Sequence, residues 1–454
     1  MSLGSPSGCD TAGMFPRRAA ALVLAIGMIA AACSTGEEPA TDDPALSDLL
    51  ERPDDGSEAE AEVTEEGATT TLLPPTPTDP PEIDGPMFAD RGVACGGART
   101  SVSLTMVGVD ADTITIGTGN DRGGFFAGDA GRAMPDAVAA MAGRCNELGG
   151  LNGRTVVVQD YDAAVSEVAG RAQQQCVEVA ALVGYGFLDV SAGAETWTAC
   201  GLPRFPGWAF DVAASPTLVA HEVAALADPA LLTAAVVGPD TAAGHAERAA
   251  AVEAMTTAGL SVVLDLAYPV TSEPDWAALA SQIQGEEVGV VHLDGGCAGA
   301  VVPLTAALAT GATDAPPYVV ADHRAYDPAC LLAAAETVSL DRLLLELPFL
   351  PVEDGAAAPT TTAYAEALDR FAVDVTGDTL LAASAFWRFV EAAGRCPGLE
   401  RSCLREGAIR AWDGLGLHPV DDERGCRVVL GVGDAGLERL APETPGTFRC
   451  PNES

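Results

Sequence analysis

Hydrophobic and polar positions follow a strand–helix–strand rhythm that is clearest over residues 112–163. Isoleucines alternate with threonines over 113–116, and this period of two predicts a strand. A glycine-rich segment at 117–128 interrupts the pattern, and apolar residues then recur at helical spacing over 131–148. Glycine-containing turns end that helix, and the valine run 156–158 is typical of a strand covered on both faces. This βαβ unit predicts a parallel sheet.

The same rhythm continues and divides into two series. In the first series, the predicted helices and strands alternate at 164–179, 180–184, 194–200 and 202–210. The second series starts near residue 230. Its predicted strands are 231–237, 261–266, 288–293 and 318–321, and its predicted helices lie within 238–259 and at 276–284 and 301–310. Two successive α/β series predict two lobes of similar build.

Composition limits the possible functions. The chain has 454 residues, of which 48% are hydrophobic, so it is long enough for two or three domains with a sizeable core. Its formal net charge of −41 argues against nonspecific nucleic-acid binding, because phosphate backbones require basic patches. Every basic residue is arginine, which excludes a Schiff-base lysine and a P-loop lysine. The hydrolase and zinc-protease motifs are also absent from the sequence, so we expect no enzyme activity, no metal and no cofactor.

The N-terminal region predicts export. Arg17 and Arg18 precede the apolar stretch 19–32, which is too short to span a bilayer as a mature helix. The following segment, Ala-Ala-Ala-Cys-Ser, resembles a bacterial lipobox, and the resemblance implies that Cys33 is lipidated after a signal peptide, residues 1–32, is removed. The alternative is an ordinary secretory signal. We expect Met14 to be the translation start, because the residues before it carry no basic side chain.

Residues 33–97 are acidic and rich in proline and threonine. Such a stretch cannot bury enough apolar surface to fold, and its charges repel one another. We therefore predict a disordered tether that holds the folded part away from a membrane.

Ten cysteines follow Cys9 and Cys33, an even number that favours disulfides in an exported chain. No CxxC pair is present, which argues against zinc ribbons and thioredoxin-like sites. Connectivity cannot be derived from sequence, and on the order of a thousand pairings are possible. Pairing sequence neighbours gives a working hypothesis: Cys95–Cys145, Cys176–Cys200, Cys297–Cys330, Cys396–Cys403 and Cys426–Cys450.

Several motifs resemble one known family. The segments GVDADTITIG at 108–117, ELGGLNGR at 147–154 and QDYDA at 159–163 are similar to the opening of type I periplasmic binding proteins, in particular the branched-chain amino-acid-binding lipoproteins of ABC transporters. The resemblance implies an α/β fold with two doubly wound, flavodoxin-like lobes joined by a three-strand hinge. We expect residues 98–227 and 346–425 to form lobe 1, and residues 228–345 and 426–454 to form lobe 2.

The resemblance also implies a function. Such a chain captures a small polar solute, an amino acid or a related molecule, between its lobes by hinge closure, and it delivers that solute to a membrane permease. The implied partners are thus a small-molecule ligand, the permease and the membrane through the lipid anchor, without nucleic acid. A ligand-sensing receptor of the same fold is the alternative, and a hydrolase with an unrecognised site is a third.

In doubly wound sheets, ligands bind at the carboxyl ends of the strands. The candidate ligand-binding residues in these loops are Asn120, Asp121, Phe125, Tyr185, Phe187, Gly207, Trp208, Ala209, Gly296, Asp322 and Arg324. Relatives place small hydroxyl residues near position 187 to bind an α-carboxylate, and this chain has Phe187 there instead. Asp322 matches the position of an acid that meets the ligand's ammonium group, whereas Arg324 leaves an anionic ligand open.

Each of these residues also has a structural explanation. The phenylalanines and Trp208 are equally typical of a packed core, and the Asp322–Arg324 segment is equally typical of a salt-bridged turn. The glycine loop at 117–128 reads GxGxxxG rather than GxGxxG, and no acid at a strand end follows it at the expected distance, which argues against a dinucleotide site.

Overall fold

A computed structural model describes residues 87–88, 93–96, 106–124, 128–207, 233–311, 316–396, 398–410, 426–433 and 436–450. The chain divides into two compact units, Met1–Pro74 and Pro75–Ser454, and all described residues belong to the second unit. Among those residues, no helix is both long enough and apolar enough to cross a membrane. Phe125, Trp208, Ala209 and Cys33 lie outside the described residues.

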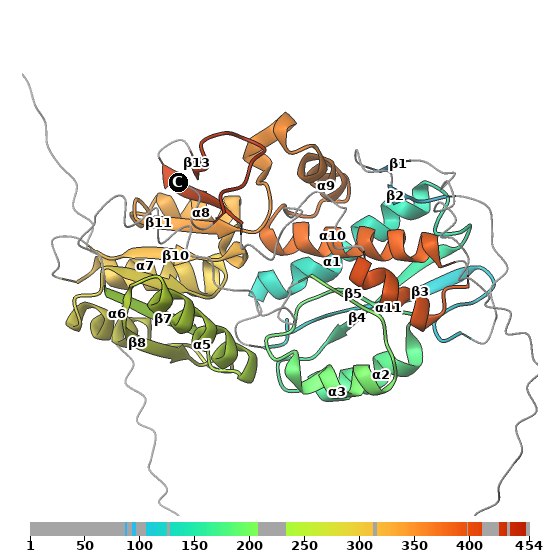
Figure 1. The fold of residues 1–454 in the computed structure, drawn as a ribbon, viewed down its shortest axis with the longest axis horizontal. Helices are drawn as coiled ribbons and strands as arrows, with labels where there is room; N and C mark the ends of the chain where they lie inside the picture. The colour runs from blue at the N-terminus through green and yellow to red at the C-terminus, as the bar shows by residue number, and fades with distance from the viewer. Residues whose placement is uncertain are drawn as a thin grey trace, which may run out of the picture. The chain divides into compact units, whose positions relative to one another are not determined.

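The first sheet has four parallel strands in the spatial order β4-β3-β5-β6 (Figure 1). The strands are β3 (Thr113–Asn120), β4 (Thr155–Asp162), β5 (Leu182–Tyr185) and β6 (Arg204–Pro206). The helices of this part are α1 (Gly128–Glu147), α2 (Val168–Glu178), α3 (Ser191–Ala199), α9 (Pro359–Arg370), α10 (Gly377–Arg395) and α11 (Arg401–Arg410). A small antiparallel pair precedes them, β1 (Met87–Phe88) with β2 (Val93–Ala94).

The second sheet has seven strands in the order β13-β12-β11-β10-β9-β7-β8. Its parallel strands are β7 (Thr233–Pro239), β8 (Ser261–Tyr268), β9 (Val290–Leu293), β10 (Tyr318–Ala321) and β11 (Leu343–Leu347). An antiparallel hairpin, β12 (Val428–Gly433) and β13 (Gly436–Ala441), extends one edge. The helical segments are α5 (Ala242–Thr257), α6 (Trp276–Gly285), η2 (Cys297–Val301), α7 (Val302–Ala309), η3 (His323–Ala325), α8 (Pro328–Ala335) and η4 (Val352–Ala357).

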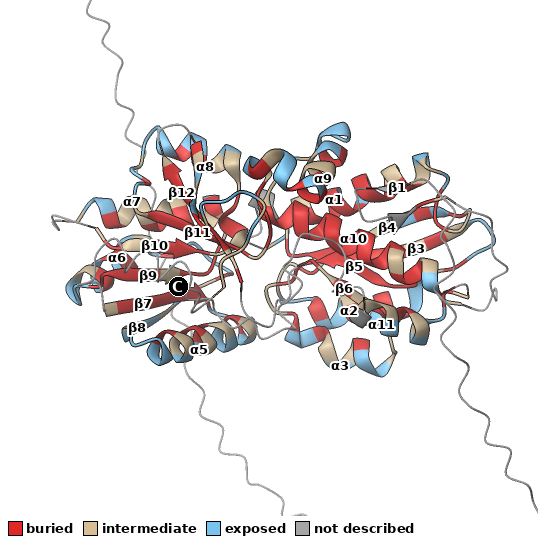
Figure 2. Cartoon of the chain, turned by 45° about the horizontal axis from the view of Figure 1, so that its top comes forward, coloured by how far each residue is buried: buried red, intermediate tan, exposed pale blue. Residues whose placement is uncertain are grey.

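The inner strands of both sheets, such as β5, β7 and β11, are buried on both faces, whereas the edge strands β4, β8 and β13 are partly exposed (Figure 2). In β3, Ile114 and Ile116 pack on the side of α1 and α10, whereas Leu182 of β5 packs on the side of α2 and α3. In the second sheet, α5 covers one face through Ala251 and Met255, and α6, α7 and α8 cover the other. The predicted α/β fold with two doubly wound lobes is therefore confirmed, and the strand series 2-1-3-4 and 2-1-3-4-5 are flavodoxin-like.

The two lobes are tied together at the end of β10. The Tyr326 hydroxyl donates to Oε2 of Glu353 at 2.7 Å and accepts from the Val352 amide at 3.2 Å, so it holds the segment that leaves β11 for α9. The Tyr326 carbonyl accepts from the Gly377 amide at 2.7 Å, at the start of α10. A Cβ at residue 377 would lie 2.0 Å from the His323 carbonyl oxygen, so only glycine permits this approach. The N-terminus of α10 is thus fixed against the second sheet.

The five predicted disulfides are confirmed. They join Cys95–Cys145, Cys176–Cys200, Cys297–Cys330, Cys396–Cys403 and Cys426–Cys450. The Cys95 bond attaches the short β1–β2 pair to α1, so ordered structure begins inside the range 33–97 that composition predicts as a tether.

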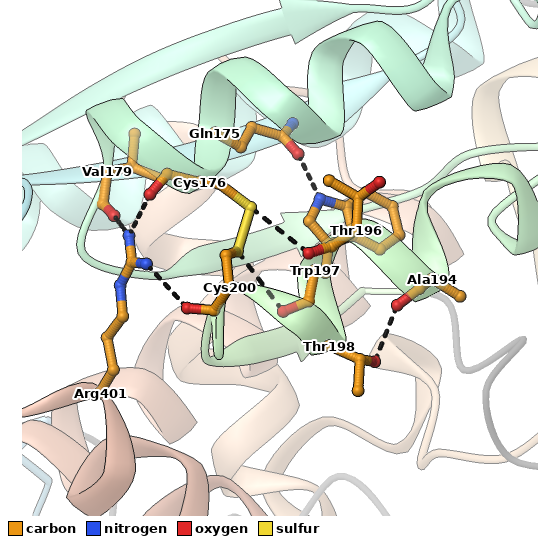
Figure 3. Close-up of a disulfide and its surroundings, with 9 residues drawn as sticks. All are labelled: Gln175, Cys176, Val179, Ala194, Thr196, Trp197, Thr198, Cys200 and Arg401. Carbon is orange, nitrogen blue, oxygen red and sulfur yellow. Dashed lines mark hydrogen bonds between the residues drawn. A yellow bond between two sulfur atoms is a disulfide. The ribbon is translucent and has the colours of Figure 1, made fainter. Parts of the chain in front are cut away.

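Arg401 of α11 holds together the ends of two helices that a disulfide also joins (Figure 3). Its guanidinium donates to the carbonyl oxygens of Cys176 and Val179, both at 2.8 Å, and of Cys200 at 3.2 Å. These carbonyls lie at the C-termini of α2 and α3, where the helix dipole favours a positive charge. Burial lowers the pKa of Arg401, but the three acceptors keep its charge hydrogen-bonded.

Replacing Arg401 with Met should destabilise this lobe. The substitution leaves three helix-terminal carbonyls without their charged donor, and we expect the free energy of unfolding to fall by about 2 to 3 kcal/mol. Urea unfolding of the oxidised protein measures this. Arg405→Met, an exposed position on the same helix, is the matched control and should change stability by less than about 0.5 kcal/mol. Equal effects of the two substitutions would contradict the capping role.

Candidate ligand-binding site

The candidate residues lie at the carboxyl edges of both sheets. In a doubly wound sheet, the loops diverge where the strand order reverses and leave a crevice there. In the first sheet this point lies between β3 and β5, which end at Asn120 and Tyr185. In the second sheet it lies between β7 and β9, which end at Pro239 and Leu293.

Asn120 is fully buried and organises the loop after β3. Its side-chain amide donates to Oδ1 of Asp160 at 2.8 Å, and its side-chain oxygen accepts from the Arg122 amide at 2.9 Å. The Arg122 guanidinium pairs with Asp160 and lies 3.7 Å from Oδ2 of Asp162. Asn120 therefore positions Arg122 between two carboxylates, and contact of Asn120 with a ligand stays a prediction.

Asp121 is also buried, with 2% of its surface exposed. One carboxylate oxygen accepts from the Val165 amide and the other from the Leu188 amide, both at 2.7 Å. Burial raises the pKa of this carboxyl from 3.8 to about 6, helped by the nearby charges of Asp162 and Asp189, although the two amide bonds act in the opposite direction. Asp121 thus joins the loops that follow β3, β4 and β5.

The raised pKa of Asp121 predicts a pH-dependent contribution to stability. Below pH 3.8 the carboxyl is protonated in both states, and between 3.8 and about 6 it stays protonated only in the folded chain. Stability from this group therefore falls as pH rises through that window, by up to about 3 kcal/mol. Urea unfolding measures the free energy of unfolding of the wild type and of Asp121→Asn. We expect the wild-type value, relative to that of the variant, to be larger at pH 4 than at pH 7. A difference that does not change with pH would contradict the prediction.

Tyr185 and Phe187 belong to an aromatic core cluster. Their ring centroids lie 5.9 Å apart, and each lies within 6 Å of the Trp197 ring. Phe187 is fully buried, and a Cβ at Gly119 would come within 2.1 Å of its ring. The ring therefore fills the space beside β3, and the structure places Phe187 in the packing of the lobe. A ligand contact from either residue stays a prediction.

Gly207 closes the loop after β6, and its amide donates to the Tyr185 carbonyl at 3.1 Å. Beside it, Arg388 of α10 donates to the Pro206 carbonyl at 2.6 Å. Burial lowers the pKa of Arg388 to about 10, while the nearby hydroxyls of Tyr364 and Tyr185 raise it. Arg388 was not among the predicted site residues, because nothing in its helical sequence context marks it.

In the second lobe, Asp322 and Arg324 come together with two further acids. Arg324 is 8% exposed, and its guanidinium donates to Oδ2 of Asp322 through Nε at 2.8 Å and through a terminal nitrogen at 2.5 Å. The same nitrogen contacts Oδ1 of Asp294 and lies 3.8 Å from Oε2 of Glu247. Gly296, the remaining predicted residue, caps the helical turn beside Asp294, and its carbonyl accepts from Ala300 and Val301.

Three carboxylates, those of Asp294, Asp322 and Glu247, lie around the Arg324 guanidinium. Burial raises the pKa of Asp322 well above its usual value, and the negative charges of Glu247, Asp378 and Glu346 add to that rise. Burial raises the pKa of Glu247 as well, against the attraction of Arg324. Both carboxyls are therefore protonated more readily than exposed ones, although Arg324 lies beside them.

Nothing in the sequence indicates Glu247 or the role of Thr241. Both lie in or before α5, more than 40 residues before β9, and no local spacing connects them to the Asp322 loop. The Thr241 hydroxyl caps α5 by accepting from the Gly244 amide, and it donates to the Leu188 carbonyl of the other lobe at 3.1 Å. In the described part of the chain, no group of three or more His, Cys, Asp or Glu side chains is arranged to hold a metal ion.

Comparison with known proteins agrees with this architecture. A family model for periplasmic binding proteins matches residues 113–411, well over half of the chain. The structure is similar to a fatty acid ABC transporter substrate-binding protein from Thermomonospora curvata, with a TM-score of 0.62 and 17% identity over 75% of this chain and 94% of that one. A leucine-binding protein from Thermotoga maritima gives a TM-score of 0.59 and 15% identity over 72% and 98%.

A third similar structure is an ABC-transporter substrate-binding protein from Aeropyrum pernix, with a TM-score of 0.60 and 16% identity over 76% of this chain and 97% of that one. A search of curated protein sequences finds no match. At these identities the solved structures establish the fold. The fold is thus the two-lobed α/β fold of extracytoplasmic solute receptors. The chain belongs to the periplasmic binding protein family, of the type I class, as its sequence motifs predict.

Proposed function

We propose that this protein is an extracytoplasmic solute-binding lipoprotein of an ABC transporter, which captures a small polar solute between its two lobes and delivers it to a permease. The observation that carries the proposal is the arrangement of polar loops at the switch points of both sheets, where Asp121, Arg324 and their partners are concentrated. The family assignment supports a solute-binding role.

Hinge closure is supported by a contact between the two switch-point loops. Thr241, at the start of α5, donates to the carbonyl of Leu188, whose amide donates to Asp121. A continuous chain of hydrogen bonds therefore connects the loop after β3 in one lobe to the loop after β7 in the other. We propose that this connection forms when the lobes close on a ligand, because closure of this kind requires contacts that only one state makes.

The names of similar proteins leave the solute open. One is described as a fatty acid transporter component, one as a leucine-binding protein, and a Streptococcus pneumoniae protein was solved with isoleucine. For this chain we propose a small polar solute, because the described parts of the loops at both switch points carry charged side chains.

A thermal-shift screen tests the binding function. The full chain, produced in an oxidising host, is melted with amino acids, carboxylates, amides, amines and fatty acids at 1 mM. A ligand with a micromolar Kd stabilises the folded chain by about 4 kcal/mol, which moves the Tm by several degrees. If no compound shifts the Tm of the folded protein and no ligand is retained from the host, the proposed function is wrong.

Lipid anchoring is tested separately at Cys33. We expect the wild-type chain to sediment with membranes and to carry a lipidated Cys33 as its new N-terminus, detected by mass spectrometry. Cys33→Ser should not be lipidated and should not sediment with membranes, because serine provides no thiol for lipid attachment. A wild-type chain that is cleaved elsewhere and stays in the soluble fraction would refute the anchor.

A further inference from the structure

The segment between β11 and α9 carries the chain from the second sheet to the helices of the first, and it bends at Gly355. This glycine interrupts η4 with φ +53° and ψ −123°, a backbone conformation that favours glycine. No heavy atom of the described residues lies within 4 Å of the position that a Cβ would take here. Gly355 is therefore suited to act as a pivot, because hinges are a few residues that absorb changes in φ and ψ.

The two sides of Gly355 are bound to different parts of the fold. Before it, Glu353 accepts from the hydroxyl of Tyr326, which follows β10 of the second sheet, at 2.7 Å. After it, the Gly355 carbonyl accepts from the Ala358 amide at 2.9 Å and from the Thr362 hydroxyl at 3.0 Å, at the start of α9. A rotation at Gly355 would therefore turn α9 relative to the second sheet.

The segment 442–450, here called the C-terminal strap, contacts both sides of this pivot. The Gly446 amide donates to Oδ2 of Asp354, directly before Gly355, at 2.9 Å. A Cβ at Gly446 would lie only 2.8 Å from the Ala357 carbonyl oxygen and 3.0 Å from the Ala357 Cβ, so the strap backbone also packs closely on the far side. Because the strap spans Gly355 in this way, it opposes rotation there.

A buried ion pair fixes the strap to the crossing segment. Arg439 of β13 donates to Oδ1 of Asp354 through Nε at 2.8 Å, and a terminal nitrogen pairs with Oδ2. The two side chains are 8% and 2% exposed. The other terminal nitrogen of Arg439 donates to the carbonyls of Pro442 at 2.9 Å and of Thr447 at 3.1 Å. One guanidinium thus holds both the crossing segment and the strap.

A disulfide closes the far end of the strap. Cys450 is bonded to Cys426, which lies just before β12. Beside this bond, Arg427 and Arg449 exchange two backbone hydrogen bonds of 2.8 and 2.9 Å. The strap is therefore fixed to the second sheet at both ends, at its start through β13 and at its end through Cys426.

We propose that the C-terminal strap is a clamp that restrains the pivot at Gly355 and thereby opposes opening of the two lobes. This inference rests on the hinge motion of the proposed function and adds the element that controls it. With the clamp in place, Thr241 of one lobe donates to Leu188 of the other. Loss of the clamp frees the pivot and shifts the population toward molecules in which this contact is broken.

Energy transfer between dyes on the two lobes tests the clamp in the full, oxidised chain without any ligand. Azidophenylalanine at Val157 and Val263 carries the dyes, because these positions on the edge strands β4 and β8 are 42% and 39% exposed. In Arg439→Met, we expect the ratio of low-transfer to high-transfer molecules to rise at least about tenfold. The control, Arg342→Met, removes a half-buried arginine that donates to the Pro316 carbonyl at the opposite end of the same sheet, and should leave the ratio unchanged.

Two disulfides provide a second matched comparison. The bridges Cys426–Cys450 and Cys176–Cys200 both have a sequence separation of 24, so their paired Cys-to-Ala variants lose a similar chain-entropy stabilisation. Only loss of Cys426–Cys450 releases the strap. We therefore expect that variant alone to raise the ratio of low-transfer molecules, in the same direction as Arg439→Met.

The outcomes separate the clamp from general destabilisation and from solute binding. Gly446→Ala keeps the ion pair and the disulfide but directs a methyl group against Ala357, so it should also raise the ratio. An unchanged ratio in the strap variants, shown to be folded by their melting curves, overturns the proposal, and so does an equal rise in the controls. A thermal-shift screen without any hit, in a protein whose lobes respond to the strap variants, would refute solute binding and leave the clamp in place.

Discussion

Arg324→Met is expected to destabilise the protein by about 3 to 5 kcal/mol at pH 7, the largest effect of any single side chain discussed above. The guanidinium is 6% exposed and is the cation that the described structure places between Asp294, Asp322 and Glu247. Methionine preserves the volume but removes the charge, so three carboxylates are left to repel one another in a buried environment. The measurement is urea unfolding of the oxidised protein.

The stability of the same variant, Arg324→Met, should depend on pH. Without Arg324, the pKa values of Asp322 and Glu247, already raised by burial, rise further in the folded chain. The folded state then binds more protons than the unfolded state, so the stability of the variant improves as pH falls. We expect the deficit relative to wild type to shrink between pH 7 and pH 5.

A surface ion pair provides the control for this experiment. Arg370 pairs with Glu147 at 3.0 Å, but its side chain is 58% exposed. Exposed pairs are screened by solvent, so Arg370→Met should leave the unfolding midpoint unchanged within error. A deficit in Arg324→Met that stays constant with pH, or that equals the effect of Arg370→Met, would refute the proposed charge cluster.

Removing the Cys95–Cys145 disulfide is expected to cost about 4 kcal/mol, the largest effect among the five bridges. This bridge spans a sequence separation of 50, the longest of the set, whereas Cys396–Cys403 spans 7. Chain-entropy theory relates the stabilisation to the logarithm of loop length and gives about 2.4 kcal/mol for the shorter bridge. The paired Cys-to-Ala variants should therefore differ by nearly 2 kcal/mol.

Differential scanning calorimetry under non-reducing conditions checks this order. Cys95, Cys145 and Cys396 are 1% exposed or less, whereas Cys403 is only partly buried, so loss of side-chain volume adds somewhat more to the deficit of the Cys95–Cys145 variant. Equal destabilisation by the two paired variants, or a larger effect at Cys396–Cys403, would show that native-state packing rather than loop entropy determines the stabilisation.

The sequence by itself determined the architecture, because local periodicity carries that information. The alternation at 113–116 and the valine run at 156–158 predicted β3 and β4, and the second series predicted β7 to β10 in order. Pairing neighbouring cysteines succeeded because no bridge spans a sequence separation of more than 50.

Only the tertiary structure decided which charged side chains meet at the candidate site and where its aromatic residues pack. From the sequence, Arg324 favoured an anionic ligand as much as Asp322 favoured a cationic one. The fold brings Asp294 and Glu247 from other elements to the same guanidinium that Asp322 contacts. Likewise, Phe187 occupies a loop in sequence but packs on Trp197 in the core. The net charge and the burial at a site depend on residues that are distant in the chain. A local sequence pattern therefore cannot predict them.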